Sequence, residues 1–325
     1  MAEKKEVILS GMQPTGKLHL GNYEGALKNW VRLQHEYDCF YCIVDWHSLT
    51  SDYEDTSDLQ ERIKEMTIDY LAAGLDPERC TIFVQSEVKE HAELHLLFSM
   101  IIPTPWLERV PSYKEKKEEL GLDSYGFLGY PLLQAADILI YKANYVPVGK
   151  DQAPHVELTR EVARRFNNLY AEVFPEPQEL LTTFPVVPGV DGRKMSKSYN
   201  NDICLADSPE LTASKLKKMF TDPQKLRKGD PGCPDICPVY DLVQIYDPDY
   251  EEVCKRCKTG ELGCVEDKTN LTKFMNEALA PVREKRRELE AKPDYIEEVL
   301  KNGAGRARRR AAETMREVKE AMRLR

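Results

Sequence analysis

"EVILSGMQPTGKLHLGN", residues 6–22, is an apolar run that leads into a glycine-bearing turn. The run predicts a short β-strand, and the turn falls where that strand ends. Gly11, four further residues and then Gly16-Lys17 match most of a phosphate-binding P-loop, GxxxxGK, but Leu18 stands where that motif needs a hydroxyl for Mg²⁺. A P-loop also leads directly into its helix, whereas here the helix is expected to open at Gly21-Asn22. The stretch is therefore a different turn, either an ordinary tight turn or one that binds a nucleotide.

Strands and helices alternate outward from this turn. Apolar residues at helical spacing predict a helix over 22–37, and a near-continuous apolar run predicts a buried strand over 39–47. A second helix is expected over 56–73, ended by Gly74, and a third strand over 81–86. This alternation predicts an α/β protein with a doubly wound parallel sheet, a Rossmann-like fold. Ligands of such sheets bind beyond the carboxyl ends of the strands, so the first turn lies at the expected nucleotide site.

The composition is that of a globular protein. The chain has 325 residues, enough for two domains, and is 42% apolar and 31% charged. Its longest apolar run is far shorter than the roughly 18–20 residues of a membrane span, and no apolar signal segment follows the charged start "MAEKKEV". We therefore expect no membrane association and a cytoplasmic location. The net charge of −9 argues against a protein that coats nucleic acid, although residues 301–325 hold nine Lys or Arg against three Glu.

A second motif lies far along the chain, in "DGRKMSKSYN", residues 191–200. Lys194 and Lys197 stand three residues apart, with Ser196 and Ser198 beside them, in a loop preceded by glycine. Two ammonium groups and two hydroxyls form a flexible clamp that suits polyphosphate. A run of charged residues is more often part of a solvated surface. The pattern is specific here because it contains the pentapeptide KMSKS and because HLGN follows the first strand.

HLGN and KMSKS together resemble the HIGH and KMSKS signatures of class I aminoacyl-tRNA synthetases. Between them, "YCIVDWHSLT", "LERVPSYKEK", "YPLLQAADILIY" and "VPVGKDQAPHVELTR" occur in the order and spacing of bacterial tryptophanyl-tRNA synthetases. The resemblance is strong over residues 7–200 and weaker beyond. It implies a Rossmann-like catalytic domain, a C-terminal α-helical domain and the ATP-dependent joining of L-tryptophan to tRNA(Trp). Tyrosyl-tRNA synthetases share part of these motifs and are the main alternative; a synthetase-like binding protein without activity is the other.

Segment 130–141 has a polar stripe in an apolar helix. Tyr130, Gln134, Asp137 and Tyr141 fall at i, i+4, i+7 and i+11, on one helix face. A buried carboxylate needs a partner, so Asp137 either pairs with a neighbouring element or accepts the indole N–H of tryptophan, which is a donor only. The resemblance implies the second role. Such a site rejects substrates that lack the matching group by a factor of about 10⁴–10⁵, and no stretch of the sequence resembles an editing domain.

Further site residues follow from the motifs and from the resemblance. The residues expected to bind ATP, together with Mg²⁺, are Gln13, Pro14, Thr15, His19, Gly21, Asn22, Gly149, Lys150, Asp151, Val187, Lys194, Met195, Ser196, Lys197 and Ser198. Those expected to act in catalysis are Gln13 and His19, which would hold ATP, and Lys116, Lys194 and Lys197, which would stabilise charge on the leaving pyrophosphate. Those expected to bind tryptophan are Ser10, His47, Tyr130, Gln134, Asp137 and Gln152.

Two positions depart from the family pattern. Gln134 stands where many bacterial tryptophan enzymes have Met and where tyrosyl enzymes often have Gln, and Ser112 stands where Gln is common. The methylene groups of Gln134 can fill the space of a Met side chain. Tryptophan is therefore kept as the expected substrate.

Five of the nine cysteines crowd residues 233–264. Cys233-x3-Cys237 and Cys254-x2-Cys257 have zinc-like spacing. The resemblance suggests instead a [4Fe–4S] cluster, for which some family members use Cys, a long gap and then Cys-x6-Cys-x2-Cys. Here Asp267 stands in place of the fourth cysteine, so another cysteine substitutes, Asp267 binds the metal, or the site is empty. The expected ligands are Cys237, Cys254, Cys257 and Cys264, with Cys233 and Asp267 as alternatives; free thiols are the remaining interpretation.

His91 and His95 stand at positions i and i+4, a spacing that can bind a metal ion on a helix. No acidic or cysteine ligand can be identified nearby in the sequence. A solvated helix face is therefore the expected interpretation of this pair.

Helical patterns dominate beyond the KMSKS motif, and Gly303 and Gly305 are expected to break the chain before its Arg-rich end. The expected organisation is an activation domain over 1–208, a helical domain over 209–302 and a last helix over 303–325 that packs on the catalytic domain. By resemblance, the helical domain binds the anticodon, and basic residues in this region would meet phosphates. An amphipathic surface helix explains the Arg run almost as well. A homodimer is implied by the resemblance alone.

Overall fold

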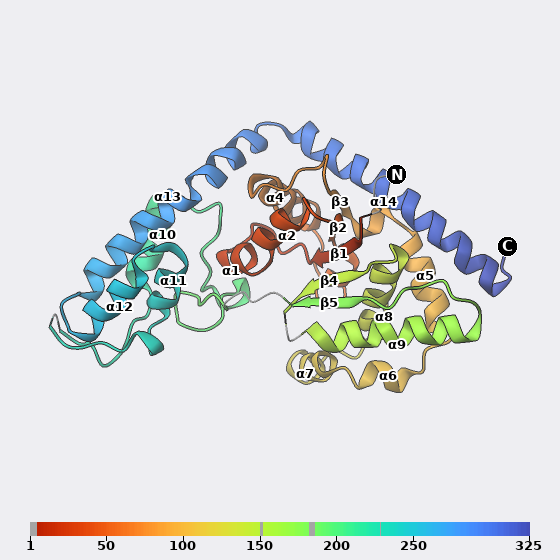
Figure 1. Cartoon of the computed structure of the whole chain (residues 1–325), viewed down its shortest axis with the longest axis horizontal. Helices are drawn as coiled ribbons and strands as arrows, with labels where there is room; N and C mark the ends of the chain where they lie inside the picture. Colours follow the sequence, from red (N-terminus) through yellow and green to blue (C-terminus); the bar gives the residue numbers. More distant parts are fainter. Residues whose placement is uncertain (1–4, 150–151, 182–185, 228) are drawn as a thin grey trace.

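The chain forms a sheet-containing part and a helical part, which two long helices, α13 (Cys264–Glu290) and α14 (Pro293–Met322), connect in an arch (Figure 1). α14 runs over the sheet-containing part, and the C-terminus lies at the end of the arch remote from the helical part. Among the helices described, none is both long and apolar enough to cross a membrane. The computed structural model describes residues 5–149, 152–181, 186–227 and 229–325, apart from the side chains of Lys116, Glu119 and Leu120.

Five parallel strands form the sheet, in the order β3-β2-β1-β4-β5. They are β1 (Val7–Met12), β2 (Asp38–Ile43), β3 (Thr81–Val84), β4 (Tyr145–Val148) and β5 (Gln178–Leu181). This arrangement confirms the doubly wound α/β fold. The chain passes from β1 to β2 on one side and later returns to β4 on the other, so the strand order reverses between β1 and β4. Ligands of such sheets bind outside the carboxyl ends of the strands at this reversal.

Both faces of the sheet are covered, which explains the near-continuous apolar strands. Along β1, Ile8 belongs to one apolar core, and Val7 and Leu9 belong to the other. Side chains of a strand alternate between faces, so a sheet covered on both sides needs apolar residues throughout. Near the sheet, the first core includes α2 (Lys28–Leu33) and α4 (Leu59–Ala72), and the second includes α5 (Glu90–Ser99), α6 (Thr104–Glu108), α7 (Pro111–Leu120), α8 (Tyr125–Ile140) and α9 (Ala153–Leu169). The last helix, α14, contributes side chains to both cores.

The elements at the carboxyl edge of the sheet are shorter and less regular than predicted. The helix expected over 22–37 consists of α1 (Leu20–Asn22), a π-helical turn η1 (Tyr23–Leu27) and α2. β2 and β3 end before their predicted limits and turn into α3 (Asp45–Ser48) and η2 (Gln85–Glu87). Polar residues that the sequence placed on strands therefore lie on short helical turns at the edge where ligands bind.

The helical part is not separately packed. Its helices are α10 (Pro209–Lys218), α11 (Pro238–Tyr246), α12 (Tyr250–Lys258) and the first half of α13. Leu242, Met275 and Leu279 are fully buried and belong to the same apolar core as Met66 of α4. One continuous core therefore fixes the position of the helical part relative to the sheet.

The expected break at Gly303 and Gly305 is wrong, because α14 continues through both residues. A Cβ on Gly303 would overlap the backbone carbonyl group of Ile82 in β3. Gly303 therefore lets a helix approach the backbone of a strand, and its place in the sequence marks close packing and not a helix end.

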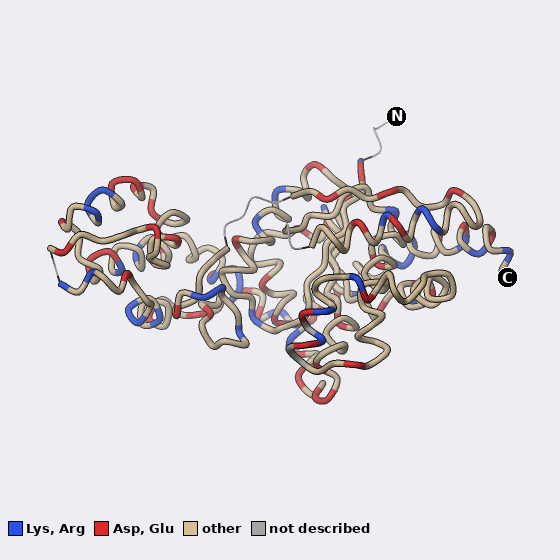
Figure 2. Tube along the Cα trace, turned by 90° about the horizontal axis from the view of Figure 1, so that it is seen from below, with Lys and Arg blue, Asp and Glu red and all other residues tan. Residues whose placement is uncertain are grey.

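The arginines of α14 bind the sheet-containing part. Arg306 donates to the carbonyl oxygens of Pro77 at 2.7 Å and Cys80 at 3.0 Å, and Arg308 donates to that of Glu87 at 2.6 Å. Figure 2 shows that Lys and Arg are interspersed with Asp and Glu along this end of the chain. These two arginines therefore help to dock the helix, and the expectation that basic residues in this region meet nucleic-acid phosphates stays a prediction.

Gly303→Ala should lower the free energy of unfolding by about 1–3 kcal/mol, because the added methyl group must push α14 away from β3. Gly305→Ala is the matched control, since the nearest atom to its added methyl group is a guanidinium nitrogen of Arg309 at 4.0 Å. Replacing a helical glycine without a clash should raise stability by about 0.5–1 kcal/mol. Urea denaturation of both variants checks the prediction, and an equal effect at the two positions would contradict it.

Candidate active site

A pocket of about 560 Å³ opens at the carboxyl ends of β1 and β4, at the reversal of strand order. Leu9, Phe127 and Ile138 supply part of its apolar wall. All six residues expected to bind the amino acid line this pocket: Ser10, His47, Tyr130, Gln134, Asp137 and Gln152.

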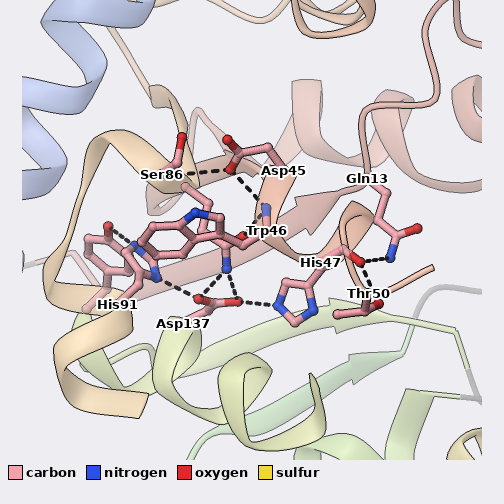
Figure 3. A network of polar contacts seen from close by, with 10 residues as sticks. Gln13, Asp45, Trp46, His47, Thr50, Ser86, His91 and Asp137 are labelled. Carbon is pink, nitrogen blue, oxygen red and sulfur yellow. Dashed lines mark hydrogen bonds and ion pairs between the residues drawn. The ribbon is translucent and has the colours of Figure 1, made fainter. Parts of the chain in front are cut away.

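Asp137 lies at the centre of a hydrogen-bond network (Figure 3) and is 3% exposed. Gln85 Nε2 donates to both of its carboxylate oxygens, at 2.8 and 2.9 Å. His47 Nε2 lies 2.7 Å from Oδ2, and His91 Nδ1 lies 2.6 Å from Oδ1. Burial alone would raise the pKa of Asp137, but the hydrogen bonds from His47 and His91 lower it well below its usual range. The carboxylate is therefore ionised and accepts from both imidazoles.

Three donor groups surround Asp137. Gln85 Nε2 is shared between the two carboxylate oxygens, and each oxygen also has one histidine nitrogen within hydrogen-bond distance. Of these donors, His47 alone also lines the pocket. A ligand that donates a hydrogen bond to Asp137 must therefore displace or share the place of His47.

His91 corrects the sequence interpretation. The expected solvated helix face is wrong for this residue, which is 0% exposed and whose Nε2 lies 2.7 Å from the hydroxyl of Tyr141. α5 packs on α8, so His91 meets the polar stripe of α8 from the side remote from the pocket. The missing acidic partner is Asp137, which lies 46 residues away in the sequence.

A second chain of polar contacts runs through Ser112, Tyr130, His155 and Gln152, which also line the pocket. Ser112 Oγ lies 2.7 Å from the hydroxyl of Tyr130 and 3.0 Å from His155 Nε2, while His155 Nδ1 lies 2.9 Å from the amide oxygen of Gln152. Sequence reasoning missed His155, although its spacing of three from Gln152 at the start of α9 was an available signal. Ser112, which departs from the family pattern, therefore contacts two of these polar residues.

His19 organises the turn after β1. It is the N-cap of α1: its Nδ1 accepts from the backbone N–H of Asn22 at 3.3 Å, and the Asn22 side chain accepts from the N–H of His19 at 3.2 Å. The helix thus opens one residue earlier than predicted. Burial lowers the pKa of His19 to about 4, with Lys197 and Lys194 lowering it further against the opposing effect of Asp202. Because Nδ1 accepts, the neutral ring carries its proton on Nε2 and can donate there.

The KMSKS loop lies against this turn. Lys197 Nζ donates to the carbonyl oxygen of Thr15, and a Cβ on Gly21 would lie 3.7 Å from the Cβ of Met195. Burial lowers the pKa of Lys197, whereas Lys194 is exposed. Thr15 and Lys197 are 182 residues apart in the sequence and are in contact, so the turn after β1 and the KMSKS loop form one site.

The other residues expected to bind ATP lie in several places. Gln13 and Gly149 line the pocket, and Pro14 is buried within the turn. Val187 is buried and accepts from the backbone N–H of Met195 at 3.0 Å. Ser196 and Ser198 lie on the loop, half-buried and exposed respectively. The expectations for Lys150, Asp151 and the side chain of Lys116 lie outside the described residues.

The cysteine segment does not form the expected ligand set. Cys237, Cys254, Cys257 and Cys264 are half-buried free thiols. Across the described side chains, no group of three or more His, Cys, Asp and Glu is placed to hold a metal ion. Lys225 Nζ lies 3.7 Å from Cys257 Sγ. The described side chains therefore give no support to the expectation of zinc or a [4Fe–4S] cluster.

Asp137 should contribute to stability in a pH-dependent manner. Its pKa is lower in the folded chain than the value of about 3.9 for an unfolded aspartate, so its contribution is present above about pH 4 and is lost as the pH falls below that value. In urea denaturation across pH 3–6, the free energy of unfolding should decrease more steeply with acid in the wild type than in Asp137→Asn. Equal slopes would show that the carboxylate is not held ionised.

Comparisons with known proteins agree with this site. The family model for class I tRNA synthetases (W and Y) matches residues 1–280. The tryptophan–tRNA ligase of Thermotoga maritima is 54% identical, over 98% of this chain and 99% of that protein, and that of Aquifex aeolicus is 46% identical over 98% and 99%. The solved tryptophanyl-tRNA synthetase of Campylobacter jejuni, complexed with ADP and tryptophan, is 36% identical, with a TM-score of 0.87 over 98% of this chain and all of that one.

A solved tyrosyl-tRNA synthetase from Archaeoglobus fulgidus is 22% identical with a TM-score of 0.68, which shows a shared fold alone. The assignment within the family rests on the full-length relatives at 46% and 54% identity, both of which are tryptophan–tRNA ligases. The chain belongs to the class I tRNA synthetases of the tryptophan and tyrosine group, among the tryptophan–tRNA ligases.

Proposed function

We propose that this site activates L-tryptophan with ATP, giving tryptophanyl-adenylate and pyrophosphate, and then transfers the aminoacyl group to tRNA(Trp). The observation that carries the proposal is the juxtaposition of two sites at one edge of the sheet. A pocket with a buried carboxylate at Asp137 continues to the end of β1, and β1 leads directly into the turn that contains His19 and that Lys197 of the KMSKS loop contacts.

The activation step requires positioning and charge stabilisation by the chain. The tryptophan carboxylate attacks the α-phosphorus of ATP, the bond from that phosphorus to the bridging oxygen breaks, and the electron pair leaves with pyrophosphate. Lys197 and Lys194 would neutralise the charge that develops on the leaving group, and His19 Nε2–H would donate to a phosphate oxygen. Mg²⁺ accompanies ATP and shields its phosphates. No protein nucleophile is needed.

Amino-acid-dependent ATP–pyrophosphate exchange without tRNA tests the substrate. We expect exchange with tryptophan and, at equal concentration, at least about 10³-fold less with tyrosine, because a pocket that reads one polar group rejects a poorly matched one strongly. Preferential exchange with tyrosine would assign the polar floor formed by Gln134 to a tyrosine pocket. Exchange with neither amino acid would favour a binding protein.

Lys197→Ala should reduce kcat of the exchange reaction by about 10²–10³-fold, the usual loss when one oriented donor to developing charge is removed. Lys218→Ala is the control, since Lys218 is an exposed lysine on α10. Steady-state kinetics, with kcat measured at saturating ATP, compares both variants with the wild type. A change in KM for ATP with kcat unaltered would contradict a role in the transition state.

Three further parts of the proposal concern assembly. We assign residues 1–208 to activation, 209–302 to anticodon binding and 303–325 to a docking helix, and we place the protein in the cytoplasm, where ATP, tRNA and tryptophan meet. A homodimer is proposed from family membership alone, and sedimentation equilibrium tests it. No reaction step is assigned to zinc or an iron–sulfur cluster; metal analysis of protein purified without oxygen tests the original expectation for the cysteines.

A further inference from the structure

Arg286 on α13 forms a buried ionic junction with the sheet-containing part. Its side chain is 3% exposed, and its guanidinium contacts the carboxylates of Asp69 and Glu65 on α4. A third carboxylate, Glu290 on the same helix, lies 3.0 Å from Nε. The rigid, planar guanidinium thus contacts a different carboxylate through each of its three nitrogens, which fixes the carboxylates relative to one another.

Asp69 transmits this orientation to the turn after β1. The carboxylate is fully buried; one oxygen contacts Arg286 and the other, Oδ2, accepts from the backbone N–H of Leu18 at 2.6 Å. Leu18 directly precedes His19, the cap residue of the turn. A buried carboxylate that loses its cation must take up a proton or move towards water, and either change alters the acceptor for Leu18.

The other end of the same turn is also attached to the helical part. Glu24 in η1 is 5% exposed, and it accepts from the hydroxyl of Tyr246 on α11 at 2.7 Å. Its second oxygen pairs with Lys28 at 2.7 Å. His19, Gly21 and Asn22 therefore lie between two anchored residues. Arg286 holds Leu18 through Asp69, and Tyr246 holds Glu24 directly.

We propose that Arg286 and Tyr246 are positioning residues for ATP, through which the helical part sets the geometry of residues 18–24. The proposal rests on the assignment of this turn to ATP. Neither side chain lines the amino-acid pocket, so their removal should weaken the use of ATP and spare that of tryptophan. The contacts between domains thereby become part of the ATP site.

The first test is Arg286→Met in tryptophan-dependent ATP–pyrophosphate exchange. KM for ATP should rise by at least about tenfold, the equivalent of one charge-assisted hydrogen bond, and KM for tryptophan should change by less than about twofold. Arg283→Met is the matched control. Arg283 is also buried on α13, but its hydrogen bonds go to Asn276 at 2.7 Å and Thr212 at 2.8 Å, both within the helical part.

A double variant separates positioning from a general loss of stability. Asn at position 69 keeps an amide oxygen for the N–H of Leu18 and needs no cation. Asp69→Asn combined with Arg286→Met should therefore restore KM for ATP towards the wild-type value, although Arg286→Met alone does not. Tyr246→Phe, compared with Tyr240→Phe on the same helix, removes one hydroxyl and tests the contact with Glu24 in a protein that keeps its packing.

The outcomes distinguish the two proposals. Wild-type protein without tryptophan-dependent exchange would overturn the proposed function. An active wild type would overturn the positioning role if Arg286→Met matches Arg283→Met in KM for ATP, if KM for both substrates rises equally, or if the double variant is no better than the single one. If Arg286→Met does not fold, the comparison of Tyr246→Phe with Tyr240→Phe decides: an unchanged KM for ATP contradicts the proposal.

Discussion

Two buried carboxylates, Asp69 and Asp137, organise the chemistry of this edge of the sheet. A charge removed from water is tolerated only when donors surround it, and the requirement for donors fixes the position of everything that supplies them. Asp137 brings α3, η2 and α5 together on α8 through His47, Gln85 and His91. Asp69 brings α13 and the turn after β1 together on α4. Each carboxylate thus joins elements that no local sequence signal connects.

Much of the fold was predictable because a sheet covered on both faces leaves a strong mark on its strands. The apolar runs of β1 and β2, the stop at Gly74 and the polar stripe of α8 follow from local periodicity and turn chemistry. HLGN and KMSKS indicated the turn and the loop, and the six residues expected around tryptophan all line one pocket. Local periodicity and short sequence motifs were sufficient to predict those features whose physical cause lies in neighbouring residues of the sequence.

The features that sequence reasoning misread or missed share a different cause. The partner of His91 lies 46 residues away in the sequence, and that of Arg286 lies 217 residues away. From the sequence alone, each of the two residues therefore looks like a solvent-exposed position on a helix. Gly303 looks like a helix end because its reason, the carbonyl group of Ile82, belongs to another element. The cysteine spacing has the same weakness, since a ligand set needs side chains that converge in space. Residues whose role depends on a distant partner carry no signal of that partner.

The donor groups around Asp137 have a consequence for discrimination between amino acids. With three donor groups already in place, an incoming N–H or O–H that takes the place of His47 gains little from the carboxylate unless His47 finds another acceptor when it is displaced. The difference in binding free energy between two ligands then depends on both bonds together: the one that the ligand makes to Asp137 and the one that His47 recovers. An indole N–H and a phenol O–H lie at different places on their side chains, so we expect them to displace His47 differently. We therefore expect specificity to depend on the Asp137–His47 pair and not on a single polar residue such as Gln134 on the same helix.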